Sequence, residues 1–511
     1  MGNSPGIDYI ALLPLIIVFG GAVLGVAVEA FLTRRGRFLA QEVLAVLTLA
    51  GAIAATAIIW FTHDTGVAGV YALMLDGPTF VVWSIVLLFS LLAVALFGDR
   101  VRGDSSFTSM GYAVPGSQLE REANREHFEH TEIFPLMLFS VFGMMLFPAA
   151  NDLIMMFVAL EVLSLPLYLL TGLARRRRMV SQEAALKYFL LGAVASAIFL
   201  YGIALTFGYA NSFIFGEIDT AILINRQSFN LILAGMGLIT VGVLFKVGAV
   251  PFHSWIPDVY TGAPTPVTAF MAIGTKAAAM VGLLRVLYVA FGSMLWNWQL
   301  EVAVIAVLTM TVGAVVGLVQ RDVKRMLAYS SIAHVGFILL GVIGAVTTGF
   351  GSVAAVNFYL IAYGAATVGA FAIVMMVRRS GGEATNMEAW QGLGRSHPVL
   401  GVFMALFLLS MTGIPLTAGF LGKLFVFTAA WQGGFQWLVP VAIAFSVVTA
   451  AFYLRLIWTM FFVDPNPDTE VASAGVGLIL VLGVCILLTV GLGILPGTVT
   501  ELLAEYSVFW R

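Results

Sequence analysis

Long apolar runs recur from one end of this 511-residue sequence to the other, and they limit what the chain can fold into. Each run is close to the roughly 20 residues that a helix needs to cross the hydrocarbon layer of a bilayer. Only 10% of the residues are charged, whereas about a quarter are charged in a typical soluble domain. A soluble α/β protein would instead alternate short strands with amphipathic helices. We therefore predict an all-α polytopic membrane protein.

The apolar runs predict about fourteen transmembrane helices. Their approximate limits are 8–31, 40–61, 77–98, 132–149, 151–173, 181–209, 229–250, 265–291, 298–320, 326–346, 351–377, 398–432, 437–463 and 474–497. The run 398–432 is too long for one straight helix. Gly413, Pro415 and Gly419 lie inside it and predict an interruption, because proline removes a helix hydrogen bond and clashes with the preceding turn.

Loop charges predict the orientation of the chain. Four basic clusters fall on one side of the expected spans: Arg34, Arg35 and Arg37; Arg175 to Arg178; Arg321, Lys324 and Arg325; Arg378, Arg379 and Arg395. The intervening loops are poor in Lys and Arg, so the positive-inside rule makes the arginine side cytoplasmic and puts both termini outside. The long loop 98–131 has mixed charge, and we expect a surface element there.

A weak internal repeat is visible in the sequence. Residues 184–191 are similar to 354–361, and the same offset of 170 sets Glu161 against Ser331 and Ser164 against His334. Chance similarity among apolar helices is the alternative explanation. Five spans separate the copies, and an odd number inverts the topology, so a two-fold axis in the membrane plane would relate the two units.

The predicted organisation therefore has two inverted five-helix repeats with broken helices 7 and 12. The expected parts are N-terminal helices 1–3 with a loop at 1–131, a first repeat and proton channel at 132–291, a second inverted repeat at 298–463, and helix 14 with a tail at 464–511.

Charged residues inside the expected spans are the best guide to chemistry. The chain has only five lysines; Lys324 is expected in a loop, and the other four, Lys187, Lys246, Lys276 and Lys423, fall inside spans. Glu161 sits in the middle of the fifth span. Each such charge costs roughly 2.5–3.5 kcal/mol at a helix centre, so these groups must be paired, hydrated or neutral for part of the time.

The choice of lysine over arginine favours a proton relay. Arginine keeps its proton in nearly any site, whereas a buried lysine can release it. Lys246 and Lys423 also lie beside expected helix breaks, at Pro251 and Pro415, where free carbonyls can hold water or a charge. The alternative is that these lysines are structural partners or extend to an interface, which is most plausible for Lys187. His334 lies within the tenth span, where a relay role and a structural role are both open.

Three ordered motifs make the chain resemble a known family. They are Phe245 to Tyr260 followed by Gly262 to Val267, then Arg321 to Ile332, and finally Gly413-Ile414-Pro415 with Gly419 to Lys423. Together they resemble the proton-conducting membrane subunits shared by NADH:quinone oxidoreductase (respiratory complex I) and multisubunit cation/proton antiporters. The likeness covers roughly 130–430.

The resemblance implies roles for particular residues. It pairs Glu161 on the fifth helix with Lys246 on the broken seventh, followed by Lys276 on the eighth and Lys423 on the broken twelfth. Lys423 argues against subunit M, which has a glutamate there. Subunit L and its antiporter relatives usually continue into a long lateral helix, whereas this chain ends at Arg511, soon after the expected fourteenth span, which argues against subunit L. Lys187 matches the sixth-helix lysine of the antiporter-like subunit N group.

The resemblance also implies a function. We expect a proton-translocating membrane subunit of NADH:quinone oxidoreductase, in the bacterial plasma (inner) membrane, that couples electron transfer in partner subunits to proton pumping. NADH, FMN, iron–sulfur clusters and quinone are expected on those partners, with no cofactor or redox centre on this chain. The single cysteine, Cys485, cannot by itself make a four-cysteine iron–sulfur site.

The expected partners are other membrane subunits, including neighbouring antiporter-like and small ones, and the lipid bilayer. The net charge of −2 and the lack of a basic tract outside short loops argue against nucleic acid. One alternative is a subunit of a multisubunit sodium/proton antiporter, which shares the charge relay but needs no redox partner. A second is a purely structural membrane scaffold with inert buried charges.

Overall fold

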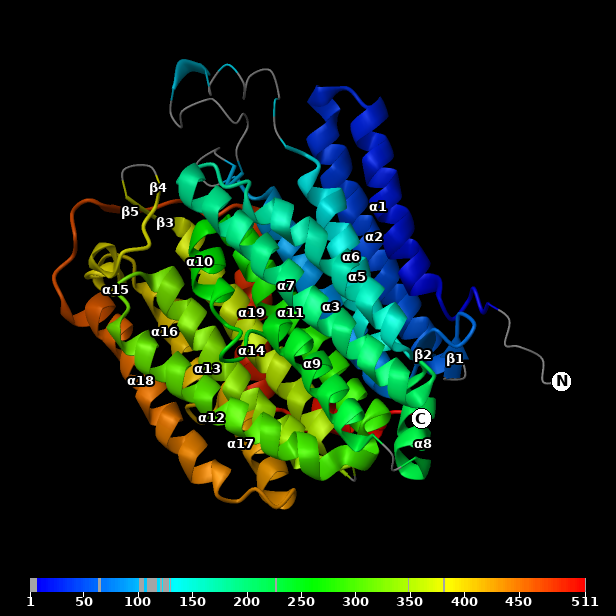
Figure 1. Cartoon of the computed structure of the whole chain (residues 1–511). Helices are drawn as coiled ribbons and strands as arrows, with labels where there is room; N and C mark the ends of the chain where they lie inside the picture. The colour runs from blue at the N-terminus through cyan, green and yellow to red at the C-terminus, as the bar shows by residue number, and fades with distance from the viewer. Residues whose placement is uncertain are drawn as a thin grey trace.

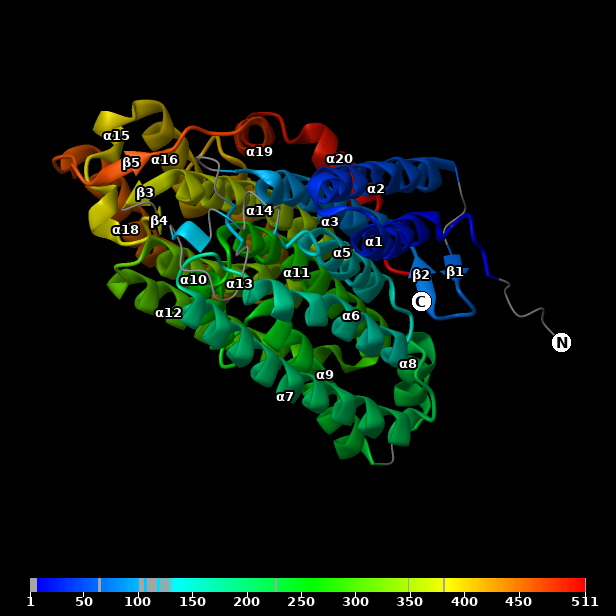
Figure 2. The ribbon, with the colours of Figure 1, turned by 90° about the horizontal axis from the view of Figure 1, so that it is seen from above.

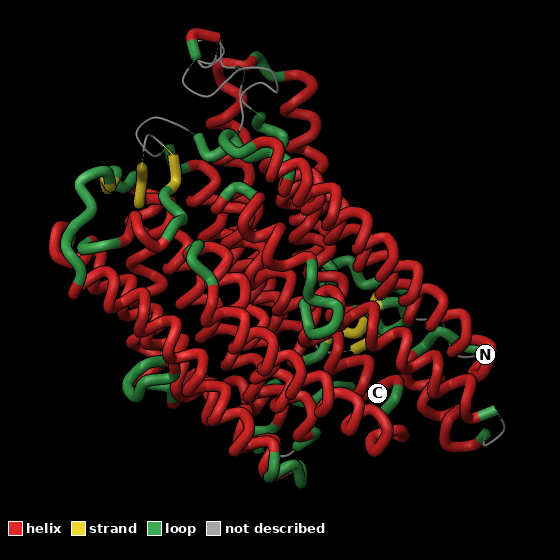
Figure 3. The backbone as a smooth tube through the Cα atoms, turned by 60° about the vertical axis from the view of Figure 1, so that its left-hand side comes forward, coloured by secondary structure: helices red, strands yellow, loops and turns green. Residues whose placement is uncertain are grey.

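Helices account for most of the chain and lie side by side in one bundle (Figure 1). The structure is a computed structural model that describes residues 7–62, 66–100, 105–107, 117–119, 122, 128, 130–225, 228–347, 349–379 and 382–510. Most of the loop 98–131 lies outside the described residues, so its expected surface role stays a prediction. Two small antiparallel sheets occupy opposite ends of the bundle (Figure 3).

The elements follow one another in this order. The first half contains α1 (Leu13–Phe31), α2 (Arg34–Thr62), β1 (Gly66–Ala68), β2 (Leu73–Leu75), α3 (Gly77–Gly98), α5 (Ile133–Ala149), α6 (Leu153–Thr171), α7 (Arg178–Ala210), α8 (Phe215–Ile224), α9 (Phe229–Val247), α10 (Trp255–Gly262), α11 (Thr265–Arg285) and η1 (Val286–Ala290). The second half contains η2 (Gly292–Met294), α12 (Leu295–Val319), α13 (Val323–Gly344), α14 (Ser352–Met376), β3 (Val377–Arg379), β4 (Gly382–Glu383), η3 (Met387–Trp390), α15 (Leu393–Ser396), α16 (Pro398–Thr412), α17 (Ala418–Gln432), α18 (Leu438–Phe462), β5 (Thr469–Val471), α19 (Val476–Ile494) and α20 (Gly497–Glu505).

The apolar helices confirm a polytopic membrane protein. Among the described residues, 12 helices are long and apolar enough to cross a membrane, or up to 13 if a bent pair counts as one span. The difference from the expected fourteen arises at two places. The run 132–149 forms α5, which has only 17 residues, and the run 398–432 forms α16 and α17 with 15 residues each.

Both expected interruptions, near Pro251 and Pro415, are present, and they share one geometry. α9 ends with Gly248 at φ +85°, and its N–H donates to the carbonyls of Leu244 and Phe245. α16 ends in the same way with Gly413 at φ +90°, whose N–H donates to the carbonyls of residues 409 and 410. Glycine suits both positions because a Cβ is unfavourable in this left-handed conformation. The two-fold relation between the halves stays a prediction.

The centre of the bundle is formed by α11, α13 and α14. These helices are buried along nearly their whole length, and Figure 2 shows them inside a ring that includes α1, α2, α7 and α18. α11 packs against α3, α5 and α14, while α13 packs against α12 and α17. Any polar side chain on the central helices is therefore shielded from lipid by protein.

A fully buried ion pair anchors the C-terminal end of α11. The Arg285 Nη2 lies 2.6 Å from Asp76 Oδ1, and the exposed fractions of the two side chains are 1% and 0%. Arg285 also donates to the Thr79 hydroxyl and to the Pro148 carbonyl, while Asp76 accepts from the backbone N–H of Trp510. The pair thus joins α11 to the start of α3, the end of α5 and the C-terminal tail.

Asp76→Asn should destabilise the chain strongly, because it leaves the buried guanidinium without a counter-charge. The expected loss is about 3–5 kcal/mol in the free energy of unfolding. Denaturant unfolding of the full chain in detergent would measure it. Asp468→Asn is the matched control: it breaks the exposed Arg379–Asp468 pair, which should contribute at most about 1 kcal/mol. Equal losses in the two variants would contradict the assignment.

Candidate functional site

Three buried lysines from separate helices form the core of the site. Lys246 on α9, Lys276 on α11 and Lys423 on α17 are 2%, 2% and 5% exposed. In the part of the chain that the structure describes, none of the three lies within ion-pair distance of a carboxylate. Their ammonium groups are held by hydroxyl and carbonyl oxygens instead.

Lys246 lies in the last turn of α9, where the negative end of the helix dipole favours a cation. Its Nζ donates to Ser164 Oγ at 2.7 Å and to the Tyr188 hydroxyl at 3.1 Å, and it lies 5.1 Å from the centre of the Tyr188 ring. Glu161, one turn before Ser164 on α6, is near enough to act on Lys246 electrostatically, but the hydrogen bond goes to the serine. One Glu161 carboxylate oxygen is buried and has no hydrogen-bond partner among the residues that the structure describes.

Lys276 joins four of the inner helices. Its Nζ donates to the Tyr260 hydroxyl on α10 at 3.0 Å and to the Ser331 hydroxyl on α13. The rings of Tyr260 and of Tyr363 on α14 lie 5.3 Å and 5.8 Å from the nitrogen. Aromatic faces attract a cation without carrying a charge, so neutral groups stabilise the ammonium here.

His334 lies one turn after Ser331 on α13 and bonds through both ring nitrogens. Nδ1 is 2.8 Å from the Tyr359 hydroxyl, and Nε2 is 3.1 Å from the Tyr453 hydroxyl. Lys276 and Lys423 both act on the ring electrostatically. A small cavity of about 10 Å³ lies beside it, which is roughly the room for one water. His334 is therefore near both lysines in a polar setting.

Lys423 is held by the broken helix itself. Its Nζ donates to the carbonyl of Thr412, the last residue of α16, at 2.8 Å, and to the Ser446 hydroxyl of α18 at 2.8 Å. The last carbonyls of a helix have no partner within that helix, so they are free to accept from a ligand or a side chain. The break beside Pro415 therefore supplies the oxygen that binds the ammonium.

Lys187 is not part of this buried set. Its side chain is 46% exposed, and its Nζ lies 2.7 Å from Glu183 and 2.8 Å from Asp258 of α10. The expected placement of Lys324 in a loop is wrong. Asp322 caps α13 by accepting from the Arg325 N–H, so the helix begins at Val323 and Lys324 is only 2% exposed.

The sequence reasoning missed the hydroxyl side chains that hold the charges. They are Ser164, Tyr188, Tyr260, Ser331, Tyr359, Ser446 and Tyr453. Two of them had a usable signal, because Ser164 lies three residues after Glu161 and Ser331 three residues before His334, on the same helix face. No metal site accompanies them: within the described ranges, no group of three His, Cys, Asp or Glu residues could hold a metal ion.

Comparisons with known proteins agree with this arrangement. The family described as NADH:quinone oxidoreductase/Mrp antiporter, TM, matches residues 150–451, which contain Glu161, His334 and the three buried lysines. The NADH-quinone oxidoreductase subunit N of Cutibacterium acnes is 51% identical over 99% of this chain and 96% of its own length. The chain belongs to the NADH:quinone oxidoreductase/Mrp antiporter family, in its subunit N group.

Two solved structures have a fold similar to that of this chain. A chain of respiratory complex I from Thermus thermophilus with bound Aureothin is 34% identical, with a TM-score of 0.78 over 96% of this chain and 100% of that one. A chain of the Mrp complex from Dietzia has a TM-score of 0.80 over 97% of each chain but is only 20% identical. The second likeness shows a shared fold alone.

Gly413→Ala should disturb the position of the Lys423 side chain. A Cβ there would lie 3.0 Å from Lys423 Cδ, and the residue would also keep an unfavourable φ of +90°. Gly434→Ala is a matched control, because Gly434 has φ +91° but open space around the added carbon. The backbone strain should cost each variant roughly 1–2 kcal/mol. Unfolding measurements on the full chain should show the larger loss for Gly413→Ala, and equal losses would mean that Lys423 moves freely.

Proposed function

We propose that this chain serves as the proton-translocating subunit N of a bacterial NADH:quinone oxidoreductase, and that its buried lysines carry the protons. The observation that supports the relay is the chemistry around the three ammonium groups. Each is removed from water yet bound by neutral oxygens and not by a carboxylate. Lys276 and Lys423 can therefore lose a proton without leaving behind a buried counter-charge among the described residues, whereas at Lys246 the nearby charge is that of Glu161.

The hydroxyl partners suit both protonation states of a lysine. A serine or tyrosine O–H accepts from an ammonium group and can rotate to donate to a neutral amine. Ser164 and Tyr188 would do this for Lys246, and Tyr260 and Ser331 for Lys276. The surroundings therefore need little rearrangement when the proton leaves.

Glu161 would control the first lysine. Its negative charge attracts the ammonium form of Lys246, and Ser164 on the same helix keeps the amine close while the carboxylate stays separate. A change of charge at Glu161, imposed from a neighbouring subunit, would change how tightly Lys246 keeps its proton. That coupling would link redox work elsewhere to proton movement here.

His334 would connect Lys276 with Lys423. Ser331 holds Lys276 one turn away from His334, and the ring bonds to Tyr359 and Tyr453 on the other side. Direct hydrogen bonds reach only about 3 Å, so the remaining gaps need bridging water. The small cavity lined by His334, Tyr359 and Gly422 is a place for one such water.

The architecture we propose is a pair of inverted five-helix units. In support, α5 packs on α6 as α12 packs on α13, and both broken helices end on a glycine with the same backbone bonds. The basic clusters around Arg175, Lys324 and Arg378 meet at one cavity, so they share one end of the bundle. By the positive-inside rule that end faces the cytoplasm, and both termini lie on the outer side of the inner membrane.

The proposed partners are the other subunits of the complex. NADH, FMN, the iron–sulfur clusters and quinone would lie on them, with this chain supplying only proton transfer. Large apolar side chains are exposed on α1, α2, α7 and α18, where lipid or neighbouring membrane subunits would cover them. Lys187 on α7 and Asp258 on α10 are partly exposed, and one such subunit would contact them.

The sodium/proton antiporter alternative has support from the fold, since the Mrp chain has a similar TM-score. The sequence favours the oxidoreductase, because identity reaches 51% with a subunit N over nearly the whole chain. Co-purification would separate the two: a flavin and iron–sulfur module that travels with the chain supports the proposal, and its absence from an active transporter complex refutes it.

Glu161→Gln should weaken proton pumping while the complex still assembles. The substitution keeps the shape of the side chain but removes the charge that acts on Lys246. Proton uptake by proteoliposomes, measured together with NADH oxidation, would report the change. Glu183→Gln is the control, because Glu183 is an exposed glutamate that pairs only with Lys187 among the described residues. Normal pumping in an assembled Glu161→Gln complex would count against this residue.

Lys276→Met and Lys276→Arg together test whether Lys276 exchanges its proton. Both should lower coupled turnover by on the order of 100-fold, the usual size of a general acid–base contribution. Arginine keeps the positive charge but does not release its proton, so it should fail almost as badly as methionine. Full activity in Lys276→Arg would show that the residue is a fixed charge, and the relay would fail at that step.

A further inference from the structure

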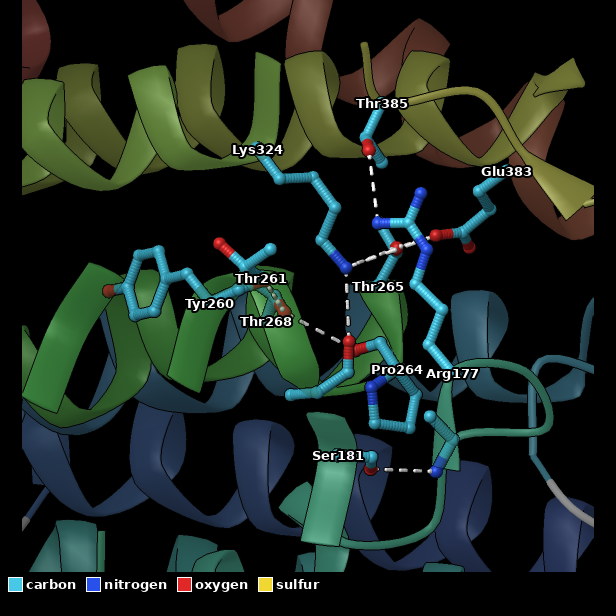
Figure 4. Close-up of polar contacts among 12 residues, drawn as sticks. Arg177, Ser181, Tyr260, Thr261, Pro264, Thr265, Thr268, Lys324, Glu383 and Thr385 are labelled. Carbon is cyan, nitrogen blue, oxygen red and sulfur yellow. Dashed lines mark hydrogen bonds and ion pairs between the residues drawn. The ribbon is translucent and has the colours of Figure 1, made fainter. Parts of the chain in front are cut away.

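A large cavity lies at the arginine-rich end of the bundle, apart from the buried lysines of the site. Its volume is about 410 Å³, within the range of roughly 300–1,000 Å³ that small-molecule pockets occupy. It forms where five segments meet: residues 105–106, the turn before α7, the junction of α10 and α11, the start of α13, and the β3–β4 hairpin with Thr385. Figure 4 shows side chains from the last four of these segments converging on one space.

The lining of this cavity is strongly cationic. Six basic side chains contribute to it, namely Arg175, Arg176, Arg177, Lys324, Arg378 and Arg379, against the single carboxylate of Glu383 among the described lining residues. Thr261 and Thr385 also line the cavity, and their hydroxyl groups donate to the Pro257 carbonyl and to Asp322 Oδ2. An excess of positive charge in a concave site attracts anions, because low-dielectric walls focus the field.

The floor of the cavity is built from fixed side chains. Lys324 is 2% exposed, and its Nζ donates to the Ala263 carbonyl and to Thr265 Oγ1, each at 3.0 Å. The Glu383 carboxylate is 3.8 Å from Nζ and also accepts from Thr265. Lys324 is therefore held in place at the base of the cavity, with its nearest counter-charge beyond hydrogen-bond distance.

The wall of the cavity is also organised. Arg177 donates from Nη1 to Thr385 Oγ1 at 3.3 Å, and Figure 4 shows its guanidinium directed toward the same space as the Lys324 ammonium. A guanidinium presents several donors in a planar fork, which matches two oxygens of a phosphate group. Two cations of different shape thus point at one position: the compact ammonium group of Lys324 and the planar guanidinium group of Arg177.

We propose that this cavity binds a phosphate group, either in the head group of an anionic phospholipid or as a free phosphate. The Lys324 and Arg177 donors match the two unbridged oxygens of a phosphodiester, and they also match the oxygens of a free phosphate. The cavity lies at the end of the bundle that the arginine clusters occupy, and basic pockets at the cytoplasmic ends of membrane helices are suited to anionic head groups.

Native mass spectrometry of the full chain in detergent would test the proposal. The probes are inorganic phosphate, a phosphatidylglycerol and a phosphatidylcholine with the same acyl chains. Phosphatidylglycerol should bind about tenfold more tightly than phosphatidylcholine, because both carry the same phosphate but only phosphatidylcholine adds a cationic group that the arginines repel. Sodium chloride should weaken the binding, because the attraction is electrostatic.

Variants locate the bound phosphate. Arg177→Gln combined with Arg379→Gln should weaken binding of the anionic probe about tenfold, while the lysine versions of both, which keep the charge but lose the planar fork, should bind with intermediate affinity. Arg395→Gln is the matched control: Arg395 is 47% exposed, pairs with Asp464 and lies outside the lining. If the double variant does not fold, Arg177→Gln alone tests the site. The Arg177 side chain is exposed, so this substitution should leave folding intact.

The outcomes are distinct. If the arginine-to-glutamine variants lose phosphatidylglycerol binding but not inorganic phosphate binding, the ligand is a lipid head group. If they lose inorganic phosphate binding, and phosphate competes with the lipid in the parent chain, the ligand is a free phosphate. Either result supports the site. Binding of all probes that is unchanged in the Arg177 variants, or is lost equally in Arg395→Gln, would overturn it.

Discussion

An ammonium group held away from water is expensive, and the inner part of this protein is arranged around that cost. Three lysines are almost fully buried, and each has at least two neutral oxygens within hydrogen-bond distance. A buried carboxylate partner would lower the cost further but would also fix the proton. Hydroxyls and aromatic faces stabilise the charge less completely, so the charged and neutral forms remain closer in free energy. That balance is what a group exchanging protons requires.

Broken helices are the second means of lowering the cost. In a membrane, backbone groups must find partners inside the protein, so a helix that stops midway leaves carbonyls in need of donors. Lys423 takes one of them at the end of α16, and Lys246 lies where the dipole of α9 is negative. The helix ends at the two breaks thus stabilise the lysine ammonium groups, and Lys423 in turn gives a free carbonyl its hydrogen-bond donor. Glycines at the two helix ends permit the left-handed turn that makes each stop sharp.

The surrounding helices divide into a rigid centre and an outer ring. α11, α13 and α14 are covered by protein, and the buried Arg285–Asp76 pair ties the end of α11 to the rest of the bundle. The packing of α11 and α13 therefore fixes the positions of Lys276 and His334 and keeps the distances to their polar partners short. At the other end of α13, Lys324 lies at the base of the cationic cavity. One central helix thus carries residues of both sites.

The sequence by itself determined the membrane class, the approximate spans, both helix breaks and the lysines, because apolar run length, proline, glycine and charge act locally. Lys324 was misplaced, since a cap by Asp322 moves the helix start by a few residues. Only the tertiary structure decided which charges are buried together. It put Ser164 on Lys246 where Glu161 was expected, turned Lys187 outward to Asp258, and brought tyrosines from α7, α10, α14 and α18 to the charges. These contacts join residues far apart in the chain, and their geometry follows from how the helices pack, which no local pattern encodes.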